Sequence, residues 1–241
     1  MVVGTGPGAA ADLSARALDA LQSADVIVGY KTYIDLIKDL IQERQVISTG
    51  MTKEKERCAA AIEQAASGHR VAVVSSGDPG VYGMAGLILE MLETTGQLNA
   101  IPVHIIPGIT SATASAARLG APLMHDFAVI SLSDLLTPWE TICQRLEAAA
   151  MADFVIVLYN PASKKRDWQI KKAKEICLKY KTPATPVGIV KNAAREDEEI
   201  YITNIADMLD HPIDMLTTVI IGNRSTRRAG GFIITPRGYT L

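Results

Sequence analysis

The sequence Met1-Val2-Val3-Gly4-Thr5-Gly6-Pro7-Gly8 opens the chain as an apolar strand that runs into a glycine-rich turn. Two later segments have the same form, Ser75-Ser76-Gly77-Asp78-Pro79-Gly80 and Ile106-Pro107-Gly108-Ile109-Thr110-Ser111-Ala112, and each leaves an apolar run. Glycine lets the backbone approach a ligand closely and adopt positive φ, and proline fixes a turn while removing an N–H donor. Three such turns predict one ligand cradle.

The first turn also fits a dinucleotide fingerprint, because Gly4-x-Gly6-x-x-Ala9 follows a strand and precedes a helical stretch. Two details weigh against a dinucleotide. Pro7 removes an amide that a pyrophosphate would use, and Asp25 precedes the next strand instead of following it. A nicotinamide-dependent oxidoreductase is therefore the alternative hypothesis, and a plain tight turn fits this loop equally well.

The composition is that of an ordinary globular protein, with 241 residues, 48% hydrophobic residues, 21% charged residues and a formal net charge of −2. No apolar stretch approaches the roughly 20 residues that span a bilayer. No basic flank of a signal peptide precedes the first strand. We therefore expect a cytoplasmic location and no membrane partner.

The cysteines and histidines are scattered along the chain. Cys58, Cys143 and Cys177 have no metal-ligand spacing, which predicts reduced, unpaired thiols. The four histidines form no pair with ligand spacing either. We expect no protein-bound metal.

Strand-like and helix-like segments alternate along the chain, which predicts an α/β fold. The expected strands are 26–28, 46–48, 71–75, 103–106, 127–131, 154–159, 186–190, 199–203, 217–221 and 231–235. The expected helices are 12–23, 53–67, 84–93, 138–150, 168–179 and 205–209, and a further helix starts just after Gly108 and carries the small residues 111–117. The texture changes near residue 120, so we predict two α/β domains, 1–119 and 120–241.

Ligands of open α/β sheets bind beyond the carboxyl ends of the strands. The three glycine loops lie at such ends, and so do residues 158–161 and 190–193. If the strands are parallel, these five segments line a ligand cleft between the two domains.

Together and in this order, four motifs resemble those of the S-adenosylmethionine-dependent tetrapyrrole methylases, which are class III methyltransferases. They are Gly4-Thr5-Gly6-Pro7-Gly8, Gly77-Asp78-Pro79, Pro107-Gly108-Ile109-Thr110 and Leu158-Tyr159-Asn160-Pro161. Residues 29–33, 120–127, 130–139 and 160–166 are similar to the branch that methylates C17 of a corrin precursor. The resemblance implies methylation of precorrin-3B or cobalt-factor III (cobalt-precorrin-3) with ring contraction, in vitamin B12 biosynthesis.

The resemblance further implies a homodimer and a folded S-adenosylmethionine molecule in the interdomain cleft. The cofactor-binding residues that it implies are Pro7, Gly77, Asp78, Val81, Thr110, Ser111, Asn160 and Ala193. This cofactor carries no pyrophosphate, so it does not need the backbone amide that Pro7 removes. Its sulfonium cation suits backbone carbonyls and a short carboxylate. Asp78 before Pro-Gly is equally explained as a turn former.

The substrate of such an enzyme is a polycarboxylate, which favours cationic ligands. We predict Lys31, His125 and Arg166 as substrate-binding residues. The catalytic residues stay unknown, since the candidate acid/base groups also fit caps or turns; they are His125, Asp126, Ser133 and Asp134. Whether the substrate is metal-free or contains cobalt stays open.

The lysine-rich segment 168–179 is interpreted as a solvated helix face. An aromatic content of 5% and a negative net charge disfavour a nucleic-acid partner. The hypothesis outside the enzymes is a non-catalytic tetrapyrrole-binding protein.

Overall fold

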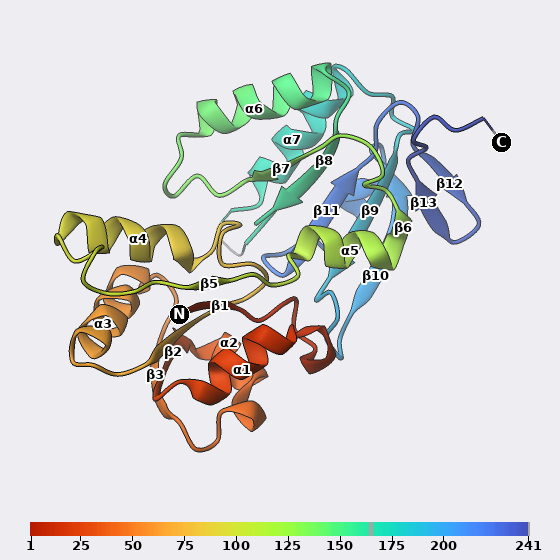
Figure 1. The fold of residues 1–241 in the computed structure, drawn as a ribbon. Helices are drawn as coiled ribbons and strands as arrows, with labels where there is room; N and C mark the ends of the chain where they lie inside the picture. The colour runs from red at the N-terminus through yellow and green to blue at the C-terminus, as the bar shows by residue number, and fades with distance from the viewer. Residues whose placement is uncertain (164–165, 241) are drawn as a thin grey trace. The chain divides into compact units, whose positions relative to one another are not determined.

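The computed structural model describes residues 1–163 and 166–240, so the predicted segment 160–166 lies partly outside the described residues. Its contacts divide the chain into two compact units, Met1–Thr110 and the part from Ser111 onward (Figure 1). Each unit has its own sheet and its own helices, which confirms the predicted α/β class.

The first unit contains a five-stranded parallel sheet with the order β3-β2-β4-β1-β5. Its strands are β1 (Val2–Gly4), β2 (Val26–Tyr30), β3 (Gln45–Thr49), β4 (Val71–Ser75) and β5 (Ile105–Ile106). Successive residues of a strand point to opposite faces, and here both faces are apolar. The sheet is therefore covered on both sides, as parallel sheets require.

Helices α1 (Ala15–Ser23) and α2 (Lys31–Leu36) pack on one face of this sheet, in a core that includes Val3 and Ile27. Helices α3 (Glu54–Ala66) and α4 (Met84–Thr94) pack on the other face, against Val2 and Val26. The first helix begins later than predicted, because a short 3-10 turn occupies Ala10–Asp12 and Ser14 caps α1 by accepting from Ala17 N at 3.1 Å.

The second unit contains a mixed sheet with the order β10-β9-β11-β8-β7. Its strands are β7 (Phe127–Ser131), β8 (Val155–Tyr159), β9 (Pro186–Lys191), β10 (Glu199–Asn204) and β11 (Thr217–Ile221). β7 and β8 are parallel, whereas β11 is antiparallel to both β8 and β9. The assumption of parallel strands is thus wrong for this sheet as a whole. Because β8 and β9 are both antiparallel to β11, they run in the same direction and their carboxyl ends lie on the same side of the sheet.

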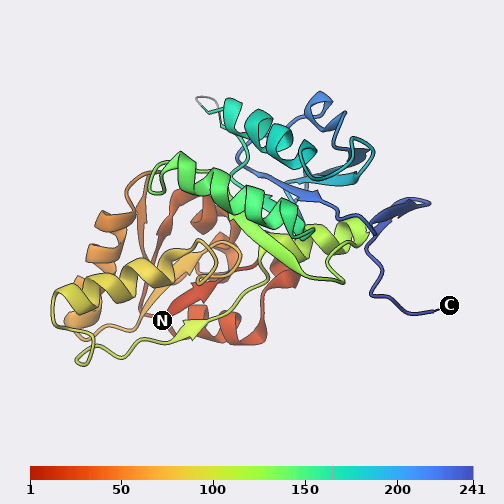
Figure 2. The same cartoon turned by 90° about the horizontal axis from the view of Figure 1, so that it is seen from above.

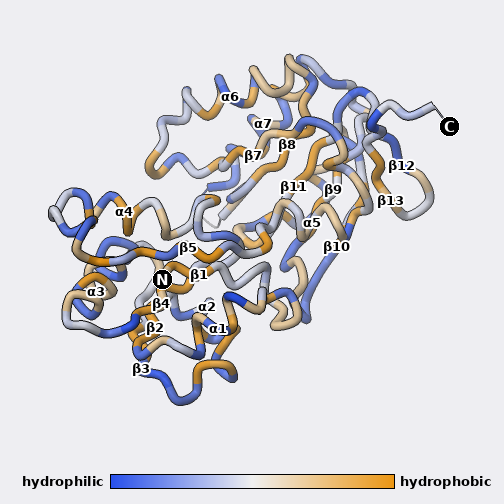
Figure 3. Tube along the Cα trace, in the orientation of Figure 1, coloured by the Kyte–Doolittle hydropathy of each residue, from blue (hydrophilic) through white to orange (hydrophobic). Residues whose placement is uncertain are grey.

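Helices α6 (Trp139–Met151) and α7 (Trp168–Leu178) lie against each other on one face of this sheet (Figure 2). On the other face lie α5 (Ser111–Leu119) and a small sheet, β12 (Arg227–Ala229), β13 (Phe232–Ile234) and β6 (Gly120–Ala121). Figure 3 shows the apolar residues that run along β8 and β9 between these layers.

The compact second unit begins with α5, whereas we expected it to begin at residue 120. The packing of α5 on β9 and β11 accounts for the difference. A Cβ added at Gly188 would lie 2.3 Å from the Leu119 side chain, so the absence of a side chain there lets α5 sit close to the sheet.

Candidate functional site

The three glycine loops of the first unit follow adjacent parallel strands. β1 lies between β4 and β5, so the loops after these strands emerge at one end of the sheet, which we call the carboxyl end (Figure 1). The chain leaves β1 toward α1 on one face and leaves β4 toward α4 on the other. Such a switch point is where open α/β sheets bind ligands.

Backbone hydrogen bonds hold the first two loops together. Gly6 N donates to Gly77 O at 3.2 Å, and Gly77 N donates to Gly6 O at 2.7 Å. Thr5 N donates to Ser75 O at 2.9 Å. The pairing of β1 with β4 thus continues beyond the strands into the loops.

Close contact between the loops accounts for two of the glycines. A Cβ on Gly108 would lie 2.2 Å from Gly77 O, and one on Gly4 would lie 2.7 Å from both Gly77 O and Gly108 N. Real Cβ atoms do not approach backbone so closely. Gly4 and Gly108 are therefore required by the neighbouring loops themselves, whatever ligand binds there.

Asp78 braces the second and third loops. Its Oδ1 accepts from Gly80 N at 2.8 Å and its Oδ2 accepts from Gly108 N at 3.1 Å. The first bond is the turn-forming contact that the sequence offered as an alternative role. The second bond is a long-range contact that the sequence did not indicate.

The other predicted residues of the first unit lie at the same end of its sheet. Pro7 is buried in the first loop, Val81 is exposed after the second, and Thr110 is half-buried after the third. Lys31 begins α2 directly after β2, and its Nζ lies 3.0 Å from Asp35 Oδ2 on the surface. The first unit therefore gathers all of its predicted residues at the carboxyl end.

Asp25 lies at the opposite end of the sheet, immediately before β2. Its carboxylate binds Arg70, with Oδ1 3.0 Å from Nη2, and these hydrogen bonds hold the pKa of Asp25 below its usual range. A dinucleotide-binding acid belongs beyond the carboxyl end of the strand. The structure therefore does not favour the oxidoreductase hypothesis.

In the second unit, Asn160 follows β8 with a positive φ of 49°. Its Nδ2 donates to Ser131 Oγ at 3.0 Å. Arg166 Nη1 donates to Asn160 O at 2.7 Å and to Leu132 O at 2.9 Å, so it clamps the loops after β7 and β8 together. Desolvation lowers the pKa of Arg166. In this structure Arg166 binds backbone carbonyl oxygens, a role that the sequence did not indicate.

Tyr159 joins the end of β8 to the start of α5. Its hydroxyl oxygen accepts from Ala112 N at 2.7 Å, next to the predicted cofactor residue Ser111, which begins the helix. This hydrogen bond satisfies one of the N–H groups that a helix leaves open in its first turn.

Ala193 is buried after β9, between Asn192 and Ala194, which both have positive φ. Asn192 Nδ2 donates to Asp197 Oδ2 at 2.7 Å, which fixes the orientation of the amide. Within residues 1–163 and 166–240, the buried Oδ1 of Asn192 has no hydrogen-bond partner. Asn192 lies in the predicted segment 190–193 but was not predicted as a site residue itself, although an asparagine at a strand's carboxyl end is a usable signal.

His125 lies at the other end of the second sheet from Arg166. It precedes β7, whereas Arg166 binds Leu132 just beyond that strand, and seven residues at about 3.3 Å each separate the two ends by roughly 20 Å. His125 Nδ1 accepts from Asp126 N at 2.9 Å. The second unit therefore does not bring His125 and Arg166 together.

The loop after β7 carries the remaining candidates and a feature that we did not predict. Asp134 accepts from Gln169 Nε2 at 3.0 Å, and Ser133 N donates to Ser131 Oγ at 3.3 Å. Leu135 and Leu136 are 78% and 97% exposed. Two adjacent exposed leucines at the carboxyl end of β7 form an apolar surface beside polar groups.

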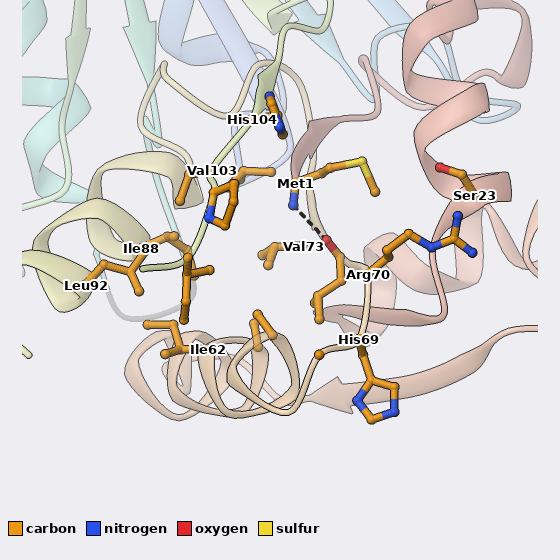
Figure 4. A pocket seen from close by; sticks show the side chains of 17 residues that line it. Met1, Ser23, Ile62, His69, Arg70, Val73, Ile88, Leu92, Val103 and His104 are labelled. Atoms are coloured by element: carbon orange, nitrogen blue, oxygen red, sulfur yellow. Dashed lines mark hydrogen bonds between the residues drawn. The ribbon is translucent and has the colours of Figure 1, made fainter. Parts of the chain in front are cut away.

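A separate cavity of about 450 Å³ lies at the amino end of the first sheet, opposite the glycine loops (Figure 4). Apolar side chains such as Val73, Ile88 and Leu92 line it, while His69 and Arg70 point away from its centre. It holds none of the predicted site residues.

The described residues contain no group of three His, Cys, Asp or Glu side chains placed to hold a metal ion. Over the same residues, no helix combines the length and apolarity needed to cross a membrane. Cys58, Cys143 and Cys177 are unpaired, as predicted.

The sequence of this chain is similar to known methyltransferases along its whole length. A cobalt-factor III methyltransferase of Priestia megaterium is 53% identical over 241 residues, which cover 99% of this chain and 45% of that protein. A probable cobalt-factor III C(17)-methyltransferase of Salmonella typhimurium is 52% identical, with 100% and 99% covered. A precorrin-3B C(17)-methyltransferase of Sinorhizobium sp is 40% identical, with 99% and 96% covered.

The fold matches as well. The crystal structure of the methyltransferase CobJ superimposes with a TM-score of 0.91 at 38% identity and covers 98% of each chain. The model of one protein family, described as tetrapyrrole (corrin/porphyrin) methylases, matches residues 1–209. Since this match includes most of the chain and the relatives extend along all of it, the protein belongs to the tetrapyrrole methylase family.

Proposed function

We propose that this protein transfers a methyl group from S-adenosylmethionine to C17 of a corrin precursor, with contraction of the macrocycle, in vitamin B12 biosynthesis. The observation that carries the proposal is the similarity, along the whole chain, to proteins named for this reaction. The switch point with its three glycine loops lies at the carboxyl end of the first sheet, where α/β sheets bind ligands, and we propose that the methyl donor binds there.

The chemistry of the carboxyl-end loops fits the methyl donor. S-adenosylmethionine supplies, when bound, a methyl group on a positively charged sulfur. Around it we assign Pro7, Gly77, Asp78, Val81 and Thr110 in the first unit, and Ser111, Asn160 and Ala193 in the second. Both Asp78 oxygens accept backbone bonds, which leaves each oxygen a further lone pair for a cation or a hydroxyl.

A buried acceptor in the second unit also fits the donor. The Oδ1 atom of Asn192, beside Ala193, has no partner among the described residues. Leaving a buried acceptor unmatched costs about 1–3 kcal/mol, so a ligand N–H or O–H at this point would recover that free energy. We add Asn192 to the residues that hold the cofactor.

The substrate side is built from apolar and cationic groups. We assign Lys31 and Arg166 to binding of the polycarboxylate substrate, Arg166 also through the carbonyls that it orients. His125 lies at the opposite end of its sheet and is not included in this assignment. Leu135 and Leu136 present an apolar surface that suits the face of a macrocycle. Methyl transfer needs alignment and exclusion of water more than a nucleophilic side chain.

The substrate is either precorrin-3B or cobalt-factor III, and the names of the relatives include both forms. We further propose a homodimer in the cytoplasm that binds neither nucleic acid nor membrane.

An anaerobic assay tests the function. The purified protein is incubated with S-adenosylmethionine and either the metal-free or the cobalt substrate, and mass spectrometry follows the product. We expect one added methyl group on one of the two substrates. Substrate that is bound but keeps its mass would instead indicate a tetrapyrrole-binding protein.

A thermal-shift measurement distinguishes the cofactors. Ligands that bind the folded state raise its melting temperature. S-adenosylmethionine or S-adenosylhomocysteine should stabilise the protein, whereas NAD or NADP should not. Stabilisation by a dinucleotide alone would contradict the proposed cofactor.

A further inference from the structure

Arg57 is a buried cation in the first unit with no acidic partner. It is the fourth residue of α3 and is 3% exposed. Its Nε donates to Thr49 Oγ1 at 2.9 Å and its Nη2 donates to Gly50 O at 3.0 Å. Met84 Sδ lies 3.7 Å from Nη1, and the Tyr30 ring centroid lies 5.8 Å from Cζ. All of these partners are neutral.

Two neighbouring cations, Lys31 and Lys53, differ from Arg57 in this respect. Lys31 lies 3.0 Å from Asp35, and Lys53 lies 2.5 Å from Glu56. Among the residues that the structure describes, no carboxylate oxygen lies within 4.0 Å of the Arg57 guanidinium. Arg57 is therefore a buried positive charge that no ion pair of the described residues neutralises.

The position of Arg57 makes this charge costly. A buried charge without a counter-ion loses hydration and gains no Coulombic attraction in return. The amino end of a helix also carries a partial positive charge, which disfavours a cation near the first turn of α3. A charge that two local rules disfavour calls for a functional reason.

The contacts of Arg57 lie at the carboxyl end of the first sheet. Tyr30 ends β2, Thr49 ends β3, and Met84 begins α4 after the second glycine loop. Lys31, assigned above to the substrate, follows Tyr30 directly. Since Arg57 is buried beneath these residues, it can act on a ligand only through its field or through the groups that it holds.

We propose that Arg57 is the electrostatic anchor that draws a carboxylate of the substrate to the Tyr30–Lys31 surface. This inference rests on the proposed function, and it makes Arg57 a positioning residue that need not touch the substrate. The exposed Lys31–Asp35 pair carries no net charge, so the buried charge of Arg57 adds to the attraction that this surface exerts on a carboxylate. Opposite charges that are not in contact still attract each other where the effective dielectric constant is well below that of water.

Substrate binding to the Arg57→Met and Arg57→Lys variants tests the proposal. Dissociation constants for cobalt-factor III and precorrin-3B are measured anaerobically at several salt concentrations, with S-adenosylhomocysteine in place of the methyl donor. We expect Arg57→Met to weaken binding about fivefold at low salt and to flatten its salt dependence. Arg57→Lys keeps the charge and should stay within twofold of the wild type.

A matched variant and a second ligand distinguish loss of the Arg57 charge from a change in the folded structure. Thr49→Val removes a partner of Arg57 but not the charge, so it should keep the wild-type salt dependence. Affinity for S-adenosylhomocysteine should change less than twofold in all variants. If Arg57→Met does not fold, Arg57→Lys decides, because a loss of substrate affinity in that variant would overturn the proposal.

Two other results are decisive. Wild-type salt dependence in a folded Arg57→Met protein would overturn the anchor while leaving the methyltransferase intact. Failure of the wild type to bind either substrate would instead refute the proposed function on which the anchor rests.

Discussion

The carboxylate of Asp78 accepts a hydrogen bond of 3.1 Å from the backbone N–H of Gly108, and this bond joins the loops that follow β4 and β5. Its other oxygen closes the turn at Gly80. One side chain therefore fixes both the shape of its own loop and the position of the next one. Asp78 has the sequence signature of a turn former, and in the structure it also stabilises the loops at the carboxyl end of the first sheet.

Asp78→Asn should weaken this brace. An amide has a single acceptor oxygen, so one of the two bonds must be lost, at a cost of about 1–3 kcal/mol in the free energy of unfolding. Urea denaturation measures the cost, and Asp39→Asn, at an exposed acid of the same unit, is the control. Equal stability of the two variants would show that Asp78 does not brace the loops.

Gly108→Ala should be strongly destabilising, because the new Cβ would lie 2.2 Å from Gly77 O. Backbone cannot yield as a flexible side chain does, so we expect a loss of about 3 kcal/mol or more. Gly86→Ala is the matched control, since Gly86 lies within α4 with nothing within 4 Å of the added Cβ. That variant should gain up to about 1 kcal/mol. Similar melting temperatures for the two variants would refute the packing argument.

The first sheet was predictable because its strands are short β-branched runs that end in glycine loops. The relative direction of the strands in the second sheet was not predictable. A strand such as β11 has the same local pattern whether it runs parallel or antiparallel to its neighbours. Its direction depends on which strands it pairs with, and long-range packing decides that. The contact of Leu119 with Gly188, which places α5 in the second unit, is another example.

The types of residue at the candidate site were easier to predict from the sequence than the groups that they contact within the protein. Asp78 was predicted as a cofactor ligand from the family resemblance, and Lys31 and Arg166 were predicted as substrate ligands because they are cations next to strand-end motifs. All three follow the carboxyl ends of strands in the structure. Each also binds a group within the protein, and sequence spacing reveals only the local contacts, Lys31 with Asp35 and Asp78 with Gly80. Arg57 was missed because a charged residue within a helix normally indicates a solvated face.

Tyr159→Phe should loosen the start of α5. The hydroxyl oxygen accepts from Ala112 N at 2.7 Å, and phenylalanine would leave this buried N–H without that acceptor. We expect a loss of about 1–3 kcal/mol. Hydrogen exchange of the Ala112 amide provides the local readout, since its protection should fall while that of β9 amides stays. Unchanged protection at Ala112 would contradict the role of this bond.

The double variant Leu135→Ser/Leu136→Ser should bind the macrocycle less well. Both side chains are exposed, so the free energy of unfolding should stay within about 0.5 kcal/mol. Losing apolar contact with the substrate should raise its KM roughly tenfold, with affinity for S-adenosylmethionine unchanged. Leu98→Ser, at an exposed leucine of the first unit, is the control. A changed sedimentation coefficient would assign the two leucines to a subunit contact instead.

Cys177 should make the stability of the protein depend on alkaline pH. Burial raises the pKa of its thiol from about 9 to about 11, so between these values the folded state holds a proton that the unfolded state has lost. The stabilisation is complete below pH 9 and is lost as the pH rises through 11. A difference of this size corresponds to about 3 kcal/mol once the titration is complete.

Cys177→Ala removes this titration, although the smaller side chain also leaves a cavity that costs stability at every pH. The difference in unfolding free energy between wild type and variant should therefore shrink by about 2 kcal/mol from pH 9 to pH 11. Urea melts at several pH values measure it. Cys143→Ala is the control, because Cys143 is less buried and should give a smaller change. A difference that stays constant for Cys177→Ala would show that the thiol ionises as readily in the folded protein as in the unfolded chain.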